Sequence, residues 1–403
     1  MGENMSLNGV VSAERVHIGF FGLRNAGKSS VVNAVTGQEL SVVSDVKGTT
    51  TDPVQKAMEI LPLGPVVVID TPGIDDEGAL GEKRVEKTYT ILNKTHIAVL
   101  VVDALKGKQQ ADNELVSVFE KKSIPYIVVY NKSDLLSEIP APKDNEIYVS
   151  ALKNENINEL KEKMASLLKS DTKEKYIVSD LLSEGDTVVL VIPIDESAPK
   201  GRLILPQQMT IRDVLQKNCT VVACQVNELK STLDNLVKKP RLVITDSQAF
   251  GAVSKIVPEN LLLTSFSILM ARYKGDLGAL VDGAVKLNGI KDGDKILISE
   301  GCTHHRQCND IGTVKIPGWI RNYTKCEPEF VFTSGGEFPK DLSGLSLIVH
   351  CGGCMLNDKE MNYRLSSAKE QGVPIVNYGV AIAQMHGILK RSLEVFPQYY
   401  EKI

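Results

Sequence analysis

Residues 16–30 read VHIGFFGLRNAGKSS, an apolar strand followed by a glycine-containing loop and the start of a helix near Ser30. Within them, residues 22–29 match G-x-x-x-x-G-K-S, a pattern that binds nucleotide phosphates when it joins a strand to a helix. The glycines let backbone N–H groups close around phosphates, and the helix N-terminus adds partial positive charge. We therefore predict that Lys28 reaches the β- and γ-phosphates and that Ser29 binds Mg²⁺. Gly27 and Ser30 are expected to complete this part of the nucleotide site.

A second segment, residues 66–73, reads VVVIDTPG and predicts a buried strand that ends in the site. Asp70 follows the apolar run directly, and we expect its carboxylate to hold Mg²⁺ through water. The N–H of Gly73 is expected to contact the γ-phosphate.

Two later strands carry the residues that select the base. The strand at 126–130 leads into Asn131, Lys132 and Asp134, and the strand at 146–149 ends in Ser150 and Ala151. A carboxylate at Asp134 accepts hydrogen bonds from both the ring N–H and the amino group of guanine. Adenine presents the opposite pattern and is rejected. The order and spacing of these segments predict a GTPase domain of Ras-like α/β fold.

The length, net charge and composition of the chain exclude several classes of protein. A chain of 403 residues corresponds to two to four domains at roughly 100–200 residues each. A net charge of −4 provides no basic surface for nucleic acid. No apolar stretch approaches the roughly 20 residues that span a membrane, and the N-terminus shows no secretory signal. Seven cysteines, an odd number, favour a reducing cytoplasm in which thiols serve a metal.

Two runs of donors stand out in the last third, Cys302-Thr303-His304 and His350-Cys351-Gly352-Gly353-Cys354. Each run follows a predicted strand, and loops after the carboxyl ends of parallel strands meet at one edge of the sheet. Three thiolates suit a tetrahedral zinc completed by a histidine, or an iron–sulfur cube with one iron left open. From the residues alone, both a zinc site and an iron–sulfur cluster remain possible.

We expect three domains, residues 10–170, 171–260 and 261–403: the GTPase, a small β-α-β domain and a doubly wound α/β domain. The middle should contain strands at 187–192, 219–224 and 241–245 and helices at 209–217, 226–237 and 247–256. The last third should contain strands at 295–299, 329–333, 346–350 and 374–377 and helices at 276–287, 359–371 and 378–392. The other donors are expected to be bystanders or to pack in the core; they are His17, Cys219, Cys224, His305, Cys308 and Cys326.

The combination of a GTPase, a small middle domain and C-x-H…H-C-x-x-C resembles the HydF family, GTPases that mature [FeFe]-hydrogenases, over nearly the whole chain. The resemblance implies that Cys302, Cys351 and Cys354 hold a [4Fe–4S] cluster, with His304 and His350 as candidates for its fourth ligand. It also implies a scaffold and carrier. Such a protein accepts a diiron precursor bearing carbonyl and cyanide ligands from radical-SAM maturases, passes it to apo-[FeFe]-hydrogenase, and forms a homodimer through its middle domain.

The segment at 48–52, GTTTD, resembles the first switch of the TrmE–Era branch of GTPases. The resemblance makes Thr50 the switch threonine on Mg²⁺ and makes Asn25 a contact to a K⁺ ion beside the phosphates. Ile74 stands where Ras-type enzymes carry a water-orienting glutamine, so we expect slow hydrolysis that K⁺ stimulates. Lys28, Thr50 and Gly73 are the expected catalytic residues.

Two alternatives remain from the residues alone. One is a zinc-stabilised GTPase that modifies or assembles RNA, although the acidic balance weighs against it. The other is a GTP-regulated thiol oxidoreductase that uses Cys351 and Cys354. The second donor run weighs against this, because a dithiol pair does not need it.

Overall fold

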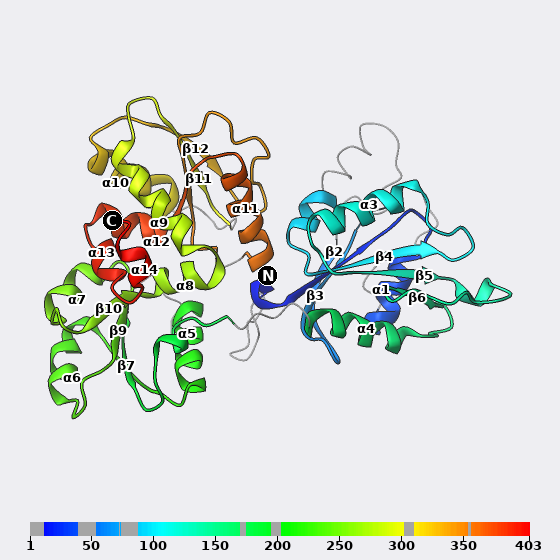
Figure 1. Cartoon of the computed structure of the whole chain (residues 1–403), viewed down its shortest axis with the longest axis horizontal. Coiled ribbons are helices and arrows are strands. Elements are labelled where there is room, and N and C mark those ends of the chain that lie inside the picture. The colour runs from blue at the N-terminus through cyan, green and yellow to red at the C-terminus, as the bar shows by residue number, and fades with distance from the viewer. Residues whose placement is uncertain are drawn as a thin grey trace. The chain divides into compact units, whose positions relative to one another are not determined.

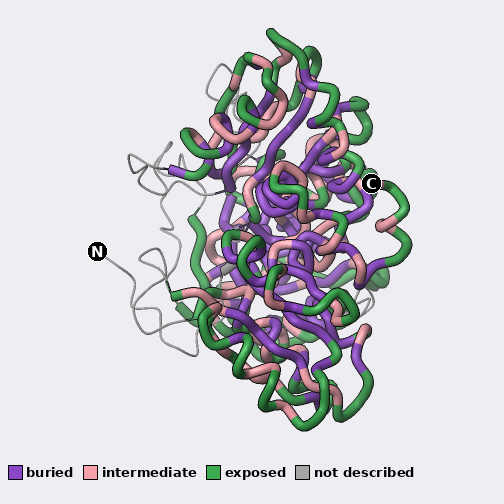
Figure 2. Tube along the Cα trace, turned by 90° about the vertical axis from the view of Figure 1, so that its left-hand side faces the viewer, coloured by how far each residue is buried: buried purple, intermediate pink, exposed green. Residues whose placement is uncertain are grey.

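The computed structural model describes residues 12–38, 54–71, 73, 88–169, 175–194, 203–301, 310–353 and 356–403. The chain divides into two compact units, and the fold of each is α/β, as predicted (Figure 1). The first unit contains Met1–Lys173 with Asn357–Glu360, and the second contains Glu174–Leu356 with Met361–Ile403. Buried residues run through the interior of each unit, and exposed residues form the turns and the outer faces of helices (Figure 2).

The first unit is built on a six-stranded sheet in the order β2-β3-β1-β4-β5-β6. Its strands are β1 (Val16–Phe21), β2 (Val54–Ile60), β3 (Gly64–Asp70), β4 (Ile97–Asp103), β5 (Tyr126–Asn131) and β6 (Glu146–Val149). All neighbouring strands are parallel except β2 and β3. Because β1, β3, β4 and β5 run the same way, their carboxyl ends bring the phosphate loop, Asp70 and Asn131 to one edge.

Helices cover both faces of this sheet (Figure 1). One face packs against α1 (Lys28–Thr36) and α4 (Ile157–Lys169), through Val31, Val35 and Leu160 among others. The other face packs against α3 (Gln110–Lys121), whose Leu115 and Phe119 are buried. Their apolar residues recur at helical spacing, so each helix buries one stripe and leaves charged residues in solvent.

The second unit contains two four-stranded sheets, and every strand pair in them is parallel. The middle sheet comprises β7 (Thr187–Val191), β8 (Thr220–Cys224), β9 (Leu242–Thr245) and β10 (Leu262–Ser265). The last sheet comprises β11 (Lys295–Ser299), β12 (Glu329–Thr333), β13 (Leu347–His350) and β14 (Ile375–Asn377). The orders β8-β7-β9-β10 and β12-β11-β13-β14 are the same arrangement: second, first, third, fourth. The middle sheet therefore extends beyond the boundary expected at residue 260.

The helices of this unit alternate with its strands. They are α5 (Leu205–Gln216), α6 (Leu229–Asn235), α7 (Phe250–Ile256), α8 (Phe266–Lys274), α9 (Leu277–Lys286), α10 (Ile316–Thr324), α11 (Asp358–Glu370), α12 (Tyr378–Met385), α13 (Leu389–Ser392) and α14 (Pro397–Tyr400). One core joins both sheets through α8, α9 and α12. The single helix expected at 378–392 is two helices, because Gly387 adopts a φ of 70° and ends α12. Among the described residues, no helix has the length and apolarity needed to cross a membrane.

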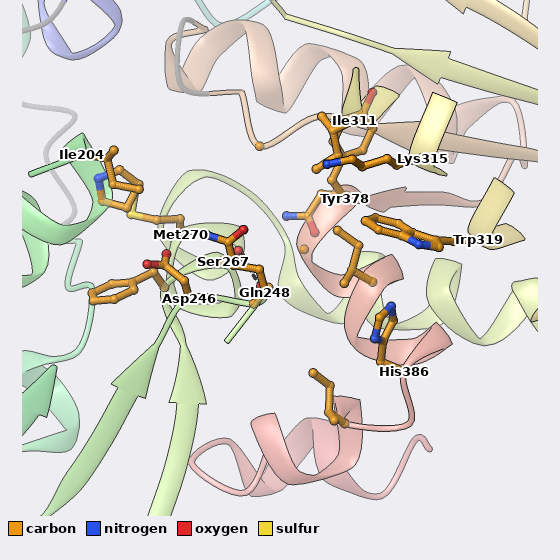
Figure 3. Close-up of a pocket in the computed structure, with 18 of the residues that line it drawn as sticks. Ile204, Asp246, Gln248, Ser267, Met270, Ile311, Lys315, Trp319, Tyr378 and His386 are labelled. Carbon is orange, nitrogen blue, oxygen red and sulfur yellow. Dashed lines mark hydrogen bonds between the residues drawn. The ribbon is translucent and has the colours of Figure 1, made fainter. Parts of the chain in front are cut away.

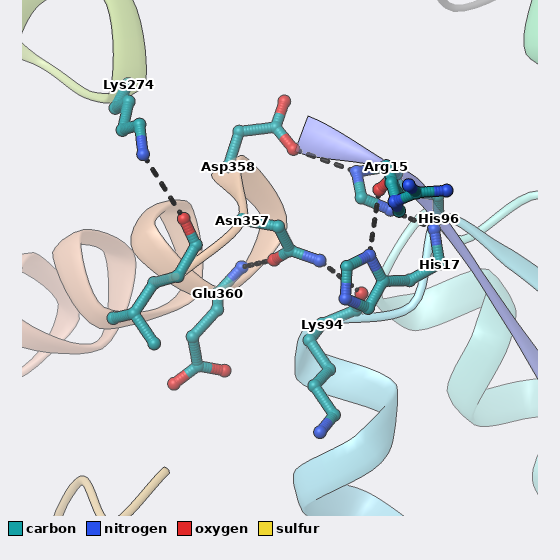
Figure 4. Close-up of polar contacts among 9 residues, drawn as sticks. Arg15, His17, Lys94, His96, Lys274, Asn357, Asp358 and Glu360 are labelled. Atoms are coloured by element: carbon teal, nitrogen blue, oxygen red, sulfur yellow. Dashed lines mark hydrogen bonds and ion pairs between the residues drawn. The ribbon is translucent and has the colours of Figure 1, made fainter. Parts of the chain in front are cut away.

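Helix α11 begins at Asp358, one residue before the expected start at 359. Asn357 caps it, because its Oδ1 accepts the Glu360 N–H at 3.0 Å (Figure 4).

His17 is a structural residue of β1, as the sequence predicted. Its Nδ1 donates to the Arg15 carbonyl at 2.9 Å, and its backbone N–H donates to His96 Nδ1 at 3.0 Å (Figure 4). The side chain is buried, and this burial lowers the pKa of His17 from 6.5 to about 4. The folded domain therefore holds a neutral imidazole.

We predict that acid destabilises the GTPase domain through this group. Between pH 6.5 and 4 the unfolded chain protonates His17 and the folded chain does not, so the free energy of unfolding falls by about 2 kcal/mol at pH 5 from this residue. Urea unfolding at pH 7 and pH 5 measures the fall. His17→Asn retains a donor for the Arg15 carbonyl and does not titrate, so its fall should be smaller by that amount. An equal fall in both proteins would exclude His17 as the cause.

Candidate functional site

The phosphate loop is set by the backbone of Gly27. This residue has a φ of 86°, and a Cβ added there would lie 2.2 Å from Asn131 Nδ2, so only glycine fits. Helix α1 begins at Lys28, two positions before the expected Ser30. Lys28 is buried, and its Nζ donates to the carbonyls of Gly22 and Leu23 at 2.9 and 2.8 Å. The ammonium group is thus held against the loop that is expected to bind phosphate.

The two expected Mg²⁺ contacts meet in the structure. Ser29 Oγ donates to Asp70 Oδ2 at 2.9 Å. The other carboxylate oxygen, Asp70 Oδ1, is buried and has no hydrogen-bond partner among the described residues. A buried carboxylate with an unsatisfied oxygen beside a hydroxyl suits a hard divalent cation, so these residues fit Mg²⁺. Gly73 is half-buried. Thr50 lies outside the described residues.

Asn131 links the phosphate loop to the loop after β6. Its Nδ2 donates to the Ala26 carbonyl at 3.1 Å, and its Oδ1 accepts the Ala151 N–H at 3.1 Å. Ser150 is fully buried, and its Oγ accepts the Lys153 N–H at 3.1 Å. One buried amide therefore fixes two of the segments that the sequence assigned to the nucleotide.

Lys132 reaches back toward the same loop. It adopts a φ of 68°, and its Nζ donates to the Asn25 carbonyl at 2.8 Å and to Asp103 Oδ2 at 2.6 Å. Asn25 is exposed, with a φ of 58°. Asp134 is half-buried in the turn that follows β5.

Asp103 is the residue that the sequence analysis missed. Burial raises its pKa, but hydrogen bonds from Lys132 and from the Leu105 N–H outweigh burial and bring the pKa below its ordinary value. Asp103 ends the apolar strand β4, as Asp70 ends β3. An aspartate at the end of an apolar strand was therefore the sequence signal that could have identified Asp103.

The two cysteine runs follow neighbouring strands of the last sheet. In the pair of β11 and β13, Ser299 lies opposite His350, so Gly301 and Cys351 emerge at the same edge. The Gly301 N–H donates to Cys351 Sγ at 2.9 Å, and the Gly353 N–H donates to the same sulfur at 3.4 Å. Gly301 directly precedes Cys302 in the sequence. Hydrogen bonds of this kind favour a thiolate, the form that binds metal.

The other expected donors cannot be placed. Cys302 and His304, with His305 and Cys308, fall in residues 302–309, and Cys354 falls in 354–355, all outside the described residues. The residues that the structure describes contain no group of three or more His, Cys, Asp or Glu side chains able to hold a metal. Cys326 contacts the carbonyls of Ile290 and Thr324 and does not lie in the Cys351 loop.

His350 lies at the end of β13, directly before the cysteine loop. It is fully buried; its Nδ1 donates to the Cys351 carbonyl at 2.6 Å, and its Nε2 accepts from Arg364 Nη1 at 2.9 Å. Burial, followed by the positive charge of Arg364, lowers the pKa of His350 to about 3, so the ring is neutral. Both ring nitrogens are hydrogen-bonded in this arrangement, and the ring supports the cysteine loop. The assignment of His350 as a candidate fourth iron ligand stays a prediction.

Arg364 ties the ends of three strands together. It is fully buried on α11, and besides His350 it donates to Ser299 Oγ at 3.2 Å and to the Gly335 carbonyl at 2.9 Å. Its guanidinium carbon also lies 5.2 Å from the centroid of the Phe338 ring. The buried guanidinium of Arg364 therefore stabilises the sheet edge from which the cysteine runs continue.

Comparison with known proteins identifies the second unit. The model of the hydrogen maturase F dimerization domain matches residues 177–275, and that of the hydrogen maturase F tetramerization domain matches residues 278–395. A model described as a 50S ribosome-binding GTPase matches residues 17–132. The chain belongs to the HydF family. This family consists of GTPases of hydrogenase maturation, and the names of its two models indicate an oligomeric protein.

The GTPase domain is also similar to GTPases that carry other names. GTPase Der of Kosmotoga olearia is 34% identical over 147 residues, which are 35% of this chain and 32% of the relative. The tRNA modification GTPase MnmE of Clostridioides difficile is 32% identical over 169 residues, 40% of this chain and 36% of the relative. The matches thus span about a third of each relative.

Among solved structures, Era of Aquifex aeolicus bound to GDP and aluminium fluoride is 20% identical, with a TM-score of 0.34 over 52% of this chain and 93% of that chain. The assignment to HydF depends on the family models and not on this likeness.

Proposed function

We propose that this HydF protein hydrolyses GTP and carries a diiron hydrogenase precursor on a [4Fe–4S] cluster held by Cys302, Cys351 and Cys354. One observation carries the proposal: the Gly301 N–H lies 2.9 Å from Cys351 Sγ, so the chain entering the first cysteine run touches the second run. Two cysteine runs that meet at one sheet edge fit a shared metal centre.

Three thiolates suit the task of a carrier. When bound, the cluster supplies an iron whose fourth ligand can be exchanged, for example for a cyanide nitrogen of the cargo. The chain's own residues hold the loop in place: the Gly353 N–H contacts Cys351 Sγ, and His350 supports the Cys351 carbonyl. His304 and His350 remain the candidate histidines for the fourth position.

The nucleotide site performs a separate task. Lys28 and the loop amides neutralise the phosphates, Ser29 and Asp70 bind Mg²⁺, and Asp134 selects guanine. Thr50 and Gly73 contact the γ-phosphate side, so loss of that phosphate releases the loops that carry them. We propose that this change controls the docking of the radical-SAM maturases and of apo-[FeFe]-hydrogenase.

The exposed edge of the middle sheet supports a homodimer. Strand β8 is an edge strand, and its residues are half-buried or exposed, whereas β9 on the other side of β7 is buried. An unpaired edge of this kind is protected when it pairs with a second copy of the chain. We propose that the dimer forms along β8.

Turnover of GTP should be higher in K⁺ than in Na⁺. Asn25 lies at the phosphate loop, and its carbonyl is already held by Lys132, so its side chain is placed to contact a monovalent cation beside the phosphates. Steady-state phosphate release in the two chloride salts, at constant ionic strength, measures the difference. Asn25→Ala should remove it. Equal wild-type rates in both salts would take this role away from Asn25.

Activation of apo-[FeFe]-hydrogenase tests the whole function. Protein reconstituted anaerobically with iron and sulfide and loaded with the diiron precursor should activate the hydrogenase, and Cys354→Ala should not. Tight zinc in the aerobic protein without iron uptake would favour a zinc-stabilised GTPase instead. A reversible disulfide with neither metal would favour a thiol oxidoreductase.

A further inference from the structure

A cavity of about 560 Å³ lies within the second unit. Residues that follow strands of both sheets line it: Asp246 follows β9, Phe266 follows β10, Gly352 follows β13 and Tyr378 follows β14. Figure 3 shows Asp246 and Met270 on one side and Tyr378, Trp319 and His386 on the other. The volume falls within the roughly 300–1,000 Å³ that is typical of small-molecule sites.

The position of this cavity follows from the shared strand order. In each sheet the second strand is added on one side of the first strand and the third strand on the other, so the strand order switches between β7 and β9 in one sheet and between β11 and β13 in the other. Parallel sheets bind ligands outside the carboxyl ends of their strands, at such a switch point. The carboxyl ends of both sheets supply walls of this cavity, and the switch point in the last sheet is the place where Gly301 meets Cys351.

The cavity adjoins the cysteine loop directly. Gly352, the neighbour of Cys351, forms part of its wall. Lys274, at the end of α8, is another wall residue and is buried. Its Nζ donates to the Gly353 carbonyl at 3.0 Å and to the Leu356 carbonyl at 3.5 Å, and Figure 4 draws the second of these contacts. A molecule in the cavity therefore contacts the loop that carries Cys351.

The polar part of the lining favours a small anion. Two cations, Lys274 and the exposed Lys315, line the cavity. The first residues of α5, α8 and α12 also line it, and helix N-termini carry partial positive charge. One acid is present, Asp246, whose Oδ2 accepts a hydrogen bond from Gln207 Nε2 at 3.1 Å.

The rest of the lining is apolar and aromatic. It includes Phe266, Met270, Ile311, Trp319 and Ile382. A free phosphate makes no favourable contact with such a surface, because all its oxygens require hydrogen-bond donors or cations. A metal complex with uncharged carbonyl ligands makes favourable contact, because these ligands make no strong hydrogen bonds, whereas its cyanide nitrogens accept hydrogen bonds and its negative charge is offset by cations.

We propose that this cavity is the chamber in which the diiron cargo sits while it is attached beside the cysteine loop. The inference rests on the proposed function, since that function names the cargo. The apolar wall would hold the carbonyl ligands, and Lys315 with the helix N-termini would hold the cyanide nitrogens. Lys274 is a positioning residue, because it fixes the cysteine loop at the mouth of the same chamber.

A bulky side chain at Gly251 tests the chamber without touching the cysteine loop. Gly251 lines the cavity on helix α7, its backbone φ is not in the positive range, and a Cβ added there meets nothing within 4 Å. Gly251→Trp should therefore fold, and its ring should occupy space that the cargo needs. Gly251→Ala is the matched control. Lys315→Glu reverses a charge in the lining, and Lys369→Glu makes the same change on the exposed part of α11, away from the cavity.

The probe is a synthetic dithiolate-bridged diiron complex with carbonyl and cyanide ligands, offered to anaerobically reconstituted full-length protein. After gel filtration, the carbonyl and cyanide infrared bands are measured per [4Fe–4S] cluster. Gly251→Trp and Lys315→Glu should keep the cluster absorbance and retain at least about tenfold less complex, while the two controls match wild type. If both variants retain as much complex as wild type, the chamber is wrong and the proposed function stands. If wild type itself retains none, the carrier function fails as well.

Discussion

Replacing Cys351 by alanine removes the iron–sulfur cluster, and the activation of apo-hydrogenase falls to background, while GTP hydrolysis stays at the wild-type rate. The thiolate is one of three expected ligands, and two ligands do not hold a cube. The hydrolysis site lies in the other compact unit of the chain, so the change leaves it intact. Iron content and absorbance near 400 nm after anaerobic reconstitution, together with phosphate release, measure the two effects.

Two further variants separate the ligand role of Cys351 from its structural role. Cys351→Ser keeps an acceptor for the Gly301 N–H and should still lose the cluster. Cys326→Ala removes a half-buried thiol that donates to the carbonyls of Ile290 and Thr324, and it should keep the cluster. Full iron uptake and hydrogenase activation by Cys351→Ala would contradict the assignment of this residue.

Replacing Asp134 by asparagine changes the base that the protein prefers. The carboxylate accepts two hydrogen bonds from guanine, whereas an asparagine amide offers one acceptor and one donor. Loss of a charge-assisted pair costs about 3–4 kcal/mol, a decrease of roughly 10²- to 10³-fold in affinity for GTP. Xanthine carries a carbonyl oxygen where guanine carries the amino group, so the variant should gain affinity for xanthosine triphosphate.

Titration with fluorescent analogues of both nucleotides measures this exchange. Asp144→Asn removes a carboxylate from an exposed position of the loop before β6 and should leave both affinities unchanged. A variant at Asp134 that lost both nucleotides equally would indicate misfolding or a different base contact, which far-ultraviolet circular dichroism distinguishes.

Several elements could be predicted to the residue because short apolar runs with sharp polar boundaries leave one choice. The strands at 16–21, 146–149, 295–299 and 329–333 are observed with the predicted bounds. The apolar run at 261–271 was less informative, because β10 passes into α8 without an intervening loop, and a buried strand and a buried helix look alike in hydrophobicity. The boundary at residue 260 followed from that ambiguity.

The sites show the same division between local and distant information. Motif spacing assigned Lys28, Ser29 and Asp70 to one predicted site, because each lies directly after or close to a predicted strand, and Ser29 contacts Asp70 in the structure. The pairing of Lys132 with Asp103, and of Arg364 with His350, joins residues from different strands and helices, and no local pattern reveals it. His350 and Cys351 are adjacent in sequence but differ in environment, because successive side chains at a strand end point to opposite faces.

The common order of the two small sheets has a consequence for biosynthesis. Each sheet is made from one uninterrupted stretch of chain, so a ribosome that has completed α8 has already supplied every strand of the middle sheet. Strand β11, by contrast, waits for its partner β13 until α10 and β12 have also been translated. The sheet edge that precedes the two cysteine runs is therefore assembled late, when the GTPase portion of the chain has already been synthesised and can have folded.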